Sequence, residues 1–242
     1  RMKEMIQDNI ATGIINLILF LLIIFFRKMI HQENVGSFLL HFDKRGRRLF
    51  LEGILSGILF FTLYPLITTI IGEGKIYIST EGAKHTLVMV LSGLFAYLSV
   101  SLLEESFFRG YMLSKLSIIL PTNIAIIIPS VFFGLFHFQA YSTSETIWIG
   151  IINATLIGII LSIIVVRTGS LMLPLGYHLS WNLIQSIIFM DYKYNIKGLI
   201  NLEVSEGLWT GYSVIPESGL IVTIICIIMF IYFNFRFRNY EN

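Results

Sequence analysis

The chain is dominated by apolar stretches long enough to cross a lipid bilayer. An α-helix rises about 1.5 Å per residue, so about 20 apolar residues cross a hydrocarbon core of about 30 Å. Seven stretches are clear: Ile10–Phe26, Leu49–Ile71, Thr86–Leu103, Thr122–Phe138, Ile147–Val166, Leu171–Met190 and Gly219–Phe235. They are continuous runs rather than the alternating segments of a membrane β-barrel. The sequence therefore predicts an all-α fold, a polytopic transmembrane helical bundle.

Composition excludes several other classes of protein. Only 13% of the 242 residues are charged and 55% are hydrophobic, whereas soluble domains carry about 25% charged residues. The single cysteine, Cys226, excludes a disulfide scaffold and a Cys-rich zinc site. A net charge of +2 is too small to suggest nucleic-acid binding. With no internal repeat or linker, we expect residues 1–242 to form a single integral membrane domain.

The number of crossings depends on an eighth candidate, Glu104–Leu120, which opens with charged residues and is apolar only in its second half. The strongest positive cluster lies between the first two spans, so we place that loop in the cytoplasm. A bundle of seven crossings collects more positive residues there than one of eight. With seven, the cytoplasmic positive residues are Arg27, Lys28, Lys44, Arg45, Arg47, Arg48, Arg109, Lys115, Arg167, Arg236 and Arg238. We expect seven or eight membrane helices.

Two adjacent carboxylates, Glu104 and Glu105, follow a purely apolar stretch. Glu105 and Arg109 are four residues apart, so they share a helix face and can pair. Glu104 is offset by about 100° and has no local cation. An unpaired carboxylate in a low-dielectric site has a raised proton affinity and is a plausible general base. Alternatively, both glutamates mark a helix end at the membrane interface.

Two further polar elements interrupt apolar stretches. His137 closes a stretch that contains Pro129, and Gly134 allows a neighbour to pack closely beside it. Taken alone, His137 suits an interfacial position. His178 and Asn182 are four residues apart near the middle of another stretch. They either form interhelical hydrogen bonds or point two neutral donors into one cavity, where they would stabilise an oxyanion.

The remaining polar residues are assigned structural positions. Asn153 stands alone in an apolar helix, so we expect it to form an interhelical hydrogen bond. Glu203, Glu206 and Glu217 are assigned to a polar loop between the last two spans.

In chain order the three elements read E-E-x-x-x-R, F-x-x-x-H and H-x-x-x-N. Together they resemble the CPBP family, the CAAX proteases and bacteriocin-processing enzymes also called the Abi family. The resemblance covers about residues 86–190. It implies an intramembrane endopeptidase that acts on a membrane-associated peptide or protein, by CAAX-type processing or by processing of a leader, bacteriocin or pheromone.

The resemblance also implies a role for each motif residue. Glu104 would be the catalytic glutamate, and His137 would help it to activate water. His178 and Asn182 would form the oxyanion site. Glu105 and Arg109 would be a structural pair that holds the Glu104 helix.

Metal use is open at this point. The family is often described as metalloproteases, and Glu104, His137 and His178 could supply a zinc site of two histidines and one carboxylate. The H-E-x-x-H spacing of a zincin is absent, however. A glutamate and a histidine can also activate water directly. We favour the metal-free site and keep zinc as the alternative.

A non-enzymatic membrane scaffold, or a bacteriocin self-immunity factor on the same fold, is the alternative function, because a fold does not fix an activity. We expect a multi-pass protein of a bacterial cell membrane. Its expected partners are the bilayer and a peptide or protein substrate, without nucleic acid, and the oligomeric state is left open.

The site conflicts with simple topology. Seven plain crossings would put Glu104 and His137 at opposite ends of their helices, where they could not meet. We therefore expect Glu104–Leu120 to be a membrane-embedded helix that can continue the preceding one.

Overall fold

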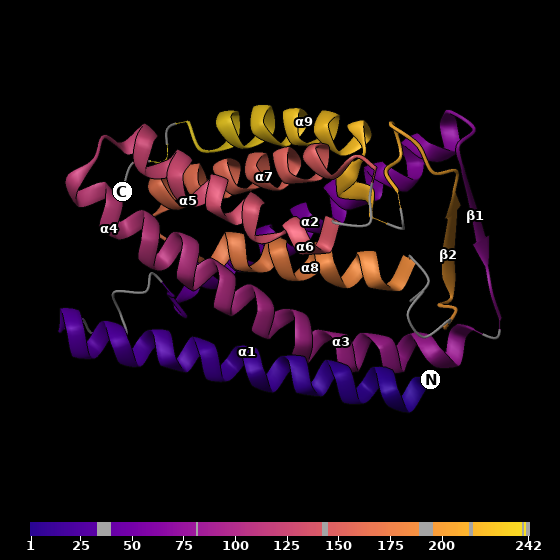
Figure 1. Ribbon diagram of the computed structural model, residues 1–242, viewed down its shortest axis with the longest axis horizontal. Coiled ribbons are helices and arrows are strands. Elements are labelled where there is room, and N and C mark those ends of the chain that lie inside the picture. Colours follow the sequence, from indigo (N-terminus) through magenta and orange to yellow (C-terminus); the bar gives the residue numbers. More distant parts are fainter. Residues whose placement is uncertain are drawn as a thin grey trace.

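The computed structural model describes residues 1–32, 40–80, 82–141, 145–188, 196–212, 215–238 and 240 (Figure 1). The α-helices are α1 (Met2–His31), α2 (Lys44–Ile70), α3 (Gly82–Glu105), α4 (Ser114–Ile119), α5 (Thr122–Phe136), α6 (Phe138–Tyr141), α7 (Ile147–Thr168), α8 (Met172–Ile188) and α9 (Leu220–Arg236). Two other helical segments are the π-helix η2 (Ser106–Leu113) and the 3-10 helix η3 (Pro216–Ser218). The predicted all-α bundle is confirmed.

A small antiparallel sheet was not predicted from the sequence. It joins β1 (Gly74–Ile78) to β2 (Ile200–Val204), with Gly74 opposite Val204 and Ile78 opposite Ile200. The two strands belong to the connections α2–α3 and α8–α9, and they lie together at one end of the bundle (Figure 1). The sheet therefore ties two distant connections together at that end.

The helices have the length and surface of membrane spans. Within the described residues, four helices are long and apolar enough to cross a bilayer: α1, α2, the helix His85–Ile119 and α7. Thr122–Phe136 and Leu220–Arg236 are shorter apolar helices. Large apolar side chains of α1, such as Ile14, Leu21 and Phe25, are exposed, as they are on a helix that faces lipid. The protein is thus an integral, multi-pass membrane protein, and the exact number of crossings stays a prediction.

The helix that carries Glu104 does not end there. α3, η2 and α4 form one continuous helix, His85–Ile119, of 35 residues. Its length of about 52 Å exceeds the hydrocarbon core of about 30 Å, and it runs obliquely across the bundle (Figure 1). The expectation that Glu104–Leu120 continues the preceding helix is confirmed. The alternative that the two glutamates mark a helix end is wrong, because the α-helix passes there into a π-helix.

The long helix bears on how Glu104 and His137 can come together. Glu104 lies near the middle of this helix rather than at its end. α5 has 15 residues, about 22 Å, so it is too short to cross the whole hydrocarbon core. His137, which directly follows α5, can therefore meet Glu104 at a similar depth without an additional crossing.

Basic side chains fasten helix ends to one another. Arg45 of α2 donates a hydrogen bond to the Thr168 carbonyl at the end of α7, at 2.8 Å. Arg236 of α9 pairs with Glu52 of α2. The sequence analysis placed Arg27 in the first loop, and this was wrong, because α1 continues to His31. Arg27 is buried and donates to the Gly110 carbonyl at 2.8 Å.

α2 and α8 form the most extensive contact between any two described elements. Glycines make this possible because they let two backbones approach closely. A Cβ atom on Gly176 would lie 2.2 Å from the Phe50 carbonyl oxygen, and one on Gly53 would lie 2.2 Å from the Leu173 carbonyl oxygen. This contact fixes the position of α8, and therefore of His178.

We predict that Gly176→Ala destabilises the protein by about 1–3 kcal/mol, the usual cost of overpacking, because the obstructing atom belongs to the backbone. Gly207→Ala is the control, since its Cβ would meet only Thr210 Oγ1, at 3.9 Å. Thermal unfolding in detergent measures both. Equal unfolding temperatures would contradict the close-packing account.

Candidate active site

A buried ion pair joins Glu105 to Arg109. Arg109 Nη1 lies 3.0 Å from Glu105 Oε1, and each side chain is 1% exposed. Their spacing of four residues predicted this contact. The Arg109 guanidinium also lies over the Phe133 ring, 4.3 Å from its centroid, so a cation–π contact ties the pair to α5.

Glu105 has a second partner that the sequence analysis missed. His178 Nδ1 lies 2.9 Å from the same Oε1 atom. A carboxylate can only accept, so Nδ1 carries the hydrogen and donates it. Glu105 therefore fixes the orientation of the His178 ring and turns Nε2 away from itself, as a carboxylate does in other histidine sites.

Glu104 lies on the other side of His178. Its Oε2 atom is 3.8 Å from His178 Nε2, and its side chain is 13% exposed. This separation is too long for a hydrogen bond. Oε2 is buried and has no hydrogen-bond partner among the described residues. Glu104 therefore has an oxygen that accepts no hydrogen bond from the described residues. This agrees with the prediction that no cation lies near Glu104 in the sequence.

His137 has a defined tautomer. Its Nδ1 atom lies 2.8 Å from the Phe133 carbonyl oxygen, one turn earlier in the chain. A carbonyl only accepts, so Nδ1 donates and, in the neutral ring, Nε2 keeps its lone pair. The ring stacks on Tyr141, with centroids 6.1 Å apart. His137 therefore presents a basic nitrogen from a fixed position.

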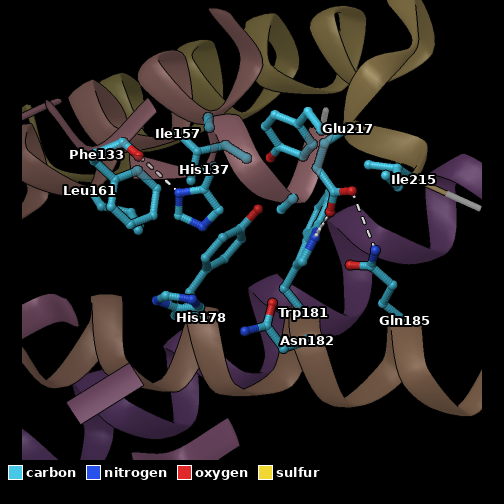
Figure 2. Close-up of a pocket in the computed structure, with 14 residues that line it drawn as sticks. Phe133, His137, Ile157, Leu161, His178, Trp181, Asn182, Gln185, Ile215 and Glu217 are labelled. Atoms are coloured by element: carbon cyan, nitrogen blue, oxygen red, sulfur yellow. Dashed lines mark hydrogen bonds between the residues drawn. The ribbon is translucent and has the colours of Figure 1, made fainter. Parts of the chain in front are cut away.

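One cavity of about 240 Å³ brings three predicted site residues together (Figure 2). His137 approaches from the end of α5, and His178 and Asn182 approach from α8. Glu104 adjoins this cavity through His178 but does not line it. The described residues show no hydrogen bond between Glu104 and His137. The motifs thus predicted that these residues lie close together, but not that Glu104 lies beside the cavity instead of lining it.

Glu217 lies between α8 and α9, as the sequence predicted, but it lines the cavity instead of facing solvent. Its side chain is buried, and its oxygens accept hydrogen bonds from Trp181 Nε1 at 2.8 Å and Gln185 Nε2 at 3.3 Å (Figure 2). Asn153 Nδ2 donates to the Glu217 carbonyl at 2.7 Å, which draws this segment against α7. Burial raises the pKa of the Glu217 carboxyl, and the two side-chain donors act in the opposite direction.

Asn153 does connect two helices, as the sequence predicted. Besides holding the Glu217 carbonyl, it accepts a hydrogen bond from Thr223 of α9 at 2.8 Å. Asn153, which the sequence analysis assigned a structural position, therefore holds Glu217, which the sequence analysis did not predict as a site residue. The only sequence signal for Glu217 is its position directly before an apolar helix.

The donor set does not fit a zinc site in this arrangement. Within the part of the chain that the structure describes, no three His, Cys, Asp or Glu side chains are gathered as metal ligands would be. Three protein ligands are the minimum for catalytic zinc. Glu104 and His178 are neighbours, whereas His137 lines the cavity that Glu104 does not line.

The site is thus a cavity inside a helical membrane bundle, lined by His137, His178, Asn182 and Glu217, with Glu104 beside it. Residues 86–184 match the family model described as type II CAAX prenyl endopeptidase Rce1-like. The three motifs lie within this match, which agrees with the resemblance to CAAX proteases that the sequence indicated. The family supports CAAX-type endopeptidase activity in general. No curated protein and no solved structure matches the chain.

We predict that Arg109→Ala destabilises the protein by about 3–5 kcal/mol, because it leaves Glu105 buried without its cation. Arg236→Ala is the matched control. It removes an arginine from a pair with Glu52 whose side chains are 31% and 17% exposed, and more exposed pairs contribute about 1 kcal/mol or less. Unfolding in detergent compares them. If Arg109→Ala lowers the free energy of unfolding no more than Arg236→Ala does, the structural role of Arg109 is refuted.

Proposed function

We propose that this protein is an endopeptidase that hydrolyses a peptide bond of a membrane-associated peptide or protein through water activated by Glu104 and His137. The observation that carries the proposal is the buried Glu104 Oε2 atom, which lacks a hydrogen-bond partner among the described residues. A carboxylate oxygen with spare acceptor capacity can bind a water and take its proton. The Rce1-like family match supports the same class of reaction.

The first step forms the bond between the water oxygen and the substrate carbonyl carbon. Glu104 takes one proton from the water as its oxygen attacks. His137 Nε2, which keeps a lone pair because Nδ1 donates to Phe133, accepts a hydrogen bond from the same water and aligns it. Because substrate binding can tighten such contacts, the present offset between Glu104 and His137 is compatible with this role.

The second requirement is to stabilise the oxyanion. His178 Nδ1 donates to Glu105, and its Nε2 faces Glu104. The oxyanion role requires the imidazolium form of His178, in which Nε2 also donates. This differs from the expectation of a neutral histidine donor. Together with the Asn182 amide on the same face of α8, this N–H would stabilise the developing negative charge.

The last step breaks the carbon–nitrogen bond. The proton held by Glu104 passes to the departing amide nitrogen, which leaves as an amine, while the oxyanion collapses to a carboxylic acid. Glu104 returns to its ionised state, so one water is consumed and no co-reactant is needed. Glu105 and Arg109 touch no reacting atom and act by positioning His178 and the helix.

A scaffold or self-immunity function on the same fold is the second candidate. It would require that the same biology persists when the polar site is neutralised. A scaffold gives no reason to gather His137, His178 and Asn182 around one cavity beside Glu104, since buried polar groups are costly. The grouping of these polar side chains therefore favours the endopeptidase over the scaffold.

We predict that Glu104→Gln lowers the rate of peptide cleavage by about 10²–10⁴-fold, the usual contribution of a general base, without lowering the unfolding temperature. Purified wild type and variant would be compared on prenylated CAAX-type peptides and on unprenylated leader-type peptides. Glu73→Gln, which also removes one carboxylate but at an exposed turn, is the control.

Each outcome has a definite meaning. Loss of cleavage in Glu104→Gln alone supports the mechanism, and the peptide that wild type cleaves identifies the substrate class. Undiminished cleavage by Glu104→Gln would refute the role of Glu104. A wild type that cleaves neither class, with its biological effect unchanged by Glu104→Gln, would favour the scaffold.

A further inference from the structure

Glu217 is held rigidly on the cavity wall. Its backbone carbonyl accepts from Asn153 Nδ2, and the next carbonyl, that of Ser218, accepts from Thr146 Oγ1 at 2.6 Å. Thr146 directly precedes α7, and Asn153 lies within this helix. The side chain then points into the cavity, between Trp181 and Gln185 of α8 (Figure 2). A carboxylate anchored from two sides is suited to recognition because it needs no rearrangement to bind.

The partners of the Glu217 side chain are neutral. Trp181 and Gln185 each donate one hydrogen bond, and among the described residues no cation forms an ion pair with Glu217. His137 lines another part of the cavity, and its Nδ1 donates to the Phe133 carbonyl. A buried carboxylate is costly unless a positive charge accompanies it. The hydrogen bonds satisfy its oxygens but supply no positive charge, so a cation bound in the cavity would favour the ionised carboxylate.

The remainder of the cavity suits the stem and head of a basic side chain. Ile157 and Leu161 provide an aliphatic wall, and Tyr141 and Trp181 provide aromatic surface. Lys and Arg side chains bury their methylene stems against apolar surface while their heads seek polar partners. Aromatic rings add attraction for a cation. The same cavity holds His137, His178 and Asn182, so a side chain bound there would be close to the reacting bond.

On the basis of the proposed function, we propose that Glu217 and the aromatic cavity beside it form a subsite for a basic side chain of the substrate, a Lys or Arg near the scissile bond. The ammonium or guanidinium group would meet the Glu217 carboxylate, and the stem would lie along Ile157 and Leu161. Glu217 is then a specificity-determining residue rather than a catalytic one, because it binds the substrate away from the reacting atoms.

A purely structural latch is the competing explanation. Glu217 connects η3 to α8 through Trp181 and Gln185, and a latch of this kind needs acceptor oxygens but no charge. Glutamine has nearly the same shape and can still accept from Trp181. Glu217→Gln therefore separates charge from shape: the latch predicts equal effects on all peptides, and the subsite predicts an effect that depends on the charge of the peptide.

The test measures peptide binding to the full-length Glu104→Gln protein, so that no turnover is needed. Short fluorescent peptides with acetylated N-termini carry one Lys, scanned across positions around the cleaved bond, and each is matched with a norleucine peptide. We expect one position at which Lys binds at least about tenfold more tightly, as hydrogen bonds to charged groups do. Adding Glu217→Gln should abolish this difference, and adding Glu203→Gln, in an exposed strand position, should preserve it.

Three results would overturn the subsite. They are no Lys preference at any position, a preference that appears only when the peptide N-terminus is free, and an equal weakening of Lys and norleucine peptides by Glu217→Gln. If Glu217→Gln fails to fold, competition decides in the parent protein: n-butylammonium should displace the Lys peptide and n-butanol at the same concentration should not, and equal displacement would refute the subsite.

The subsite and the proposed function fail separately in this design. Charge-dependent binding in a protein whose wild type cleaves no peptide would refute the endopeptidase while supporting a cation-binding cavity. Cleavage by wild type without any charge preference would refute the subsite alone.

Discussion

The buried contact among Glu105, Arg109 and His178 is the interaction on which the site depends. It places one positive and one negative side chain, each 1% exposed, inside a helical membrane bundle. Such a pair is costly to desolvate and is retained only with good geometry and further hydrogen bonds. Here Glu105 supplies one by accepting from His178. The long helix and α8 are therefore joined in a fixed relative position. Glu105 contacts Nδ1 of the His178 ring, and Glu104 lies near Nε2 on the opposite side of that ring.

The π-helix η2 belongs to the same constraint. It begins directly after Glu105 and contains Arg109, and π segments within helices are frequent at functional sites. A π-turn widens the helix by one residue, so the side chains that follow it point in different directions than an α-helix would give. The segment thereby presents Arg109 to both Glu105 and the Phe133 ring, while the helix continues without a break.

Much of the architecture could be predicted from sequence because membrane helices are encoded locally. Apolar run length gave the bundle, and spacing of four residues gave the Glu105–Arg109 pair. The continuity of His85–Ile119 was harder to predict, because two glutamates in the middle of a helix resemble a helix end. The small sheet was not predicted, since its two strands, Gly74–Ile78 and Ile200–Val204, are distant in sequence.

The site was predictable only where it consists of motifs. His137, His178 and Asn182 do line one cavity, but the hydrogen bond between Glu105 and His178 spans 73 positions and leaves no local pattern. Glu217 was missed for the same reason. Its burial depends on Trp181, Gln185 and Asn153, none of which is near it in sequence. Acidic residues between two spans are ordinarily solvated, so the composition of this connection indicated an exposed Glu217.

We propose that Glu104 and His137 activate water without a metal ion, and the metal content of the purified, active protein before and after chelation decides this. We expect full cleavage activity with metal well below one equivalent, and no gain when zinc is added back. Stoichiometric zinc, with activity lost on chelation and restored by zinc, would refute the metal-free mechanism. It would make Glu104, His137 and His178 metal ligands in a rearranged site.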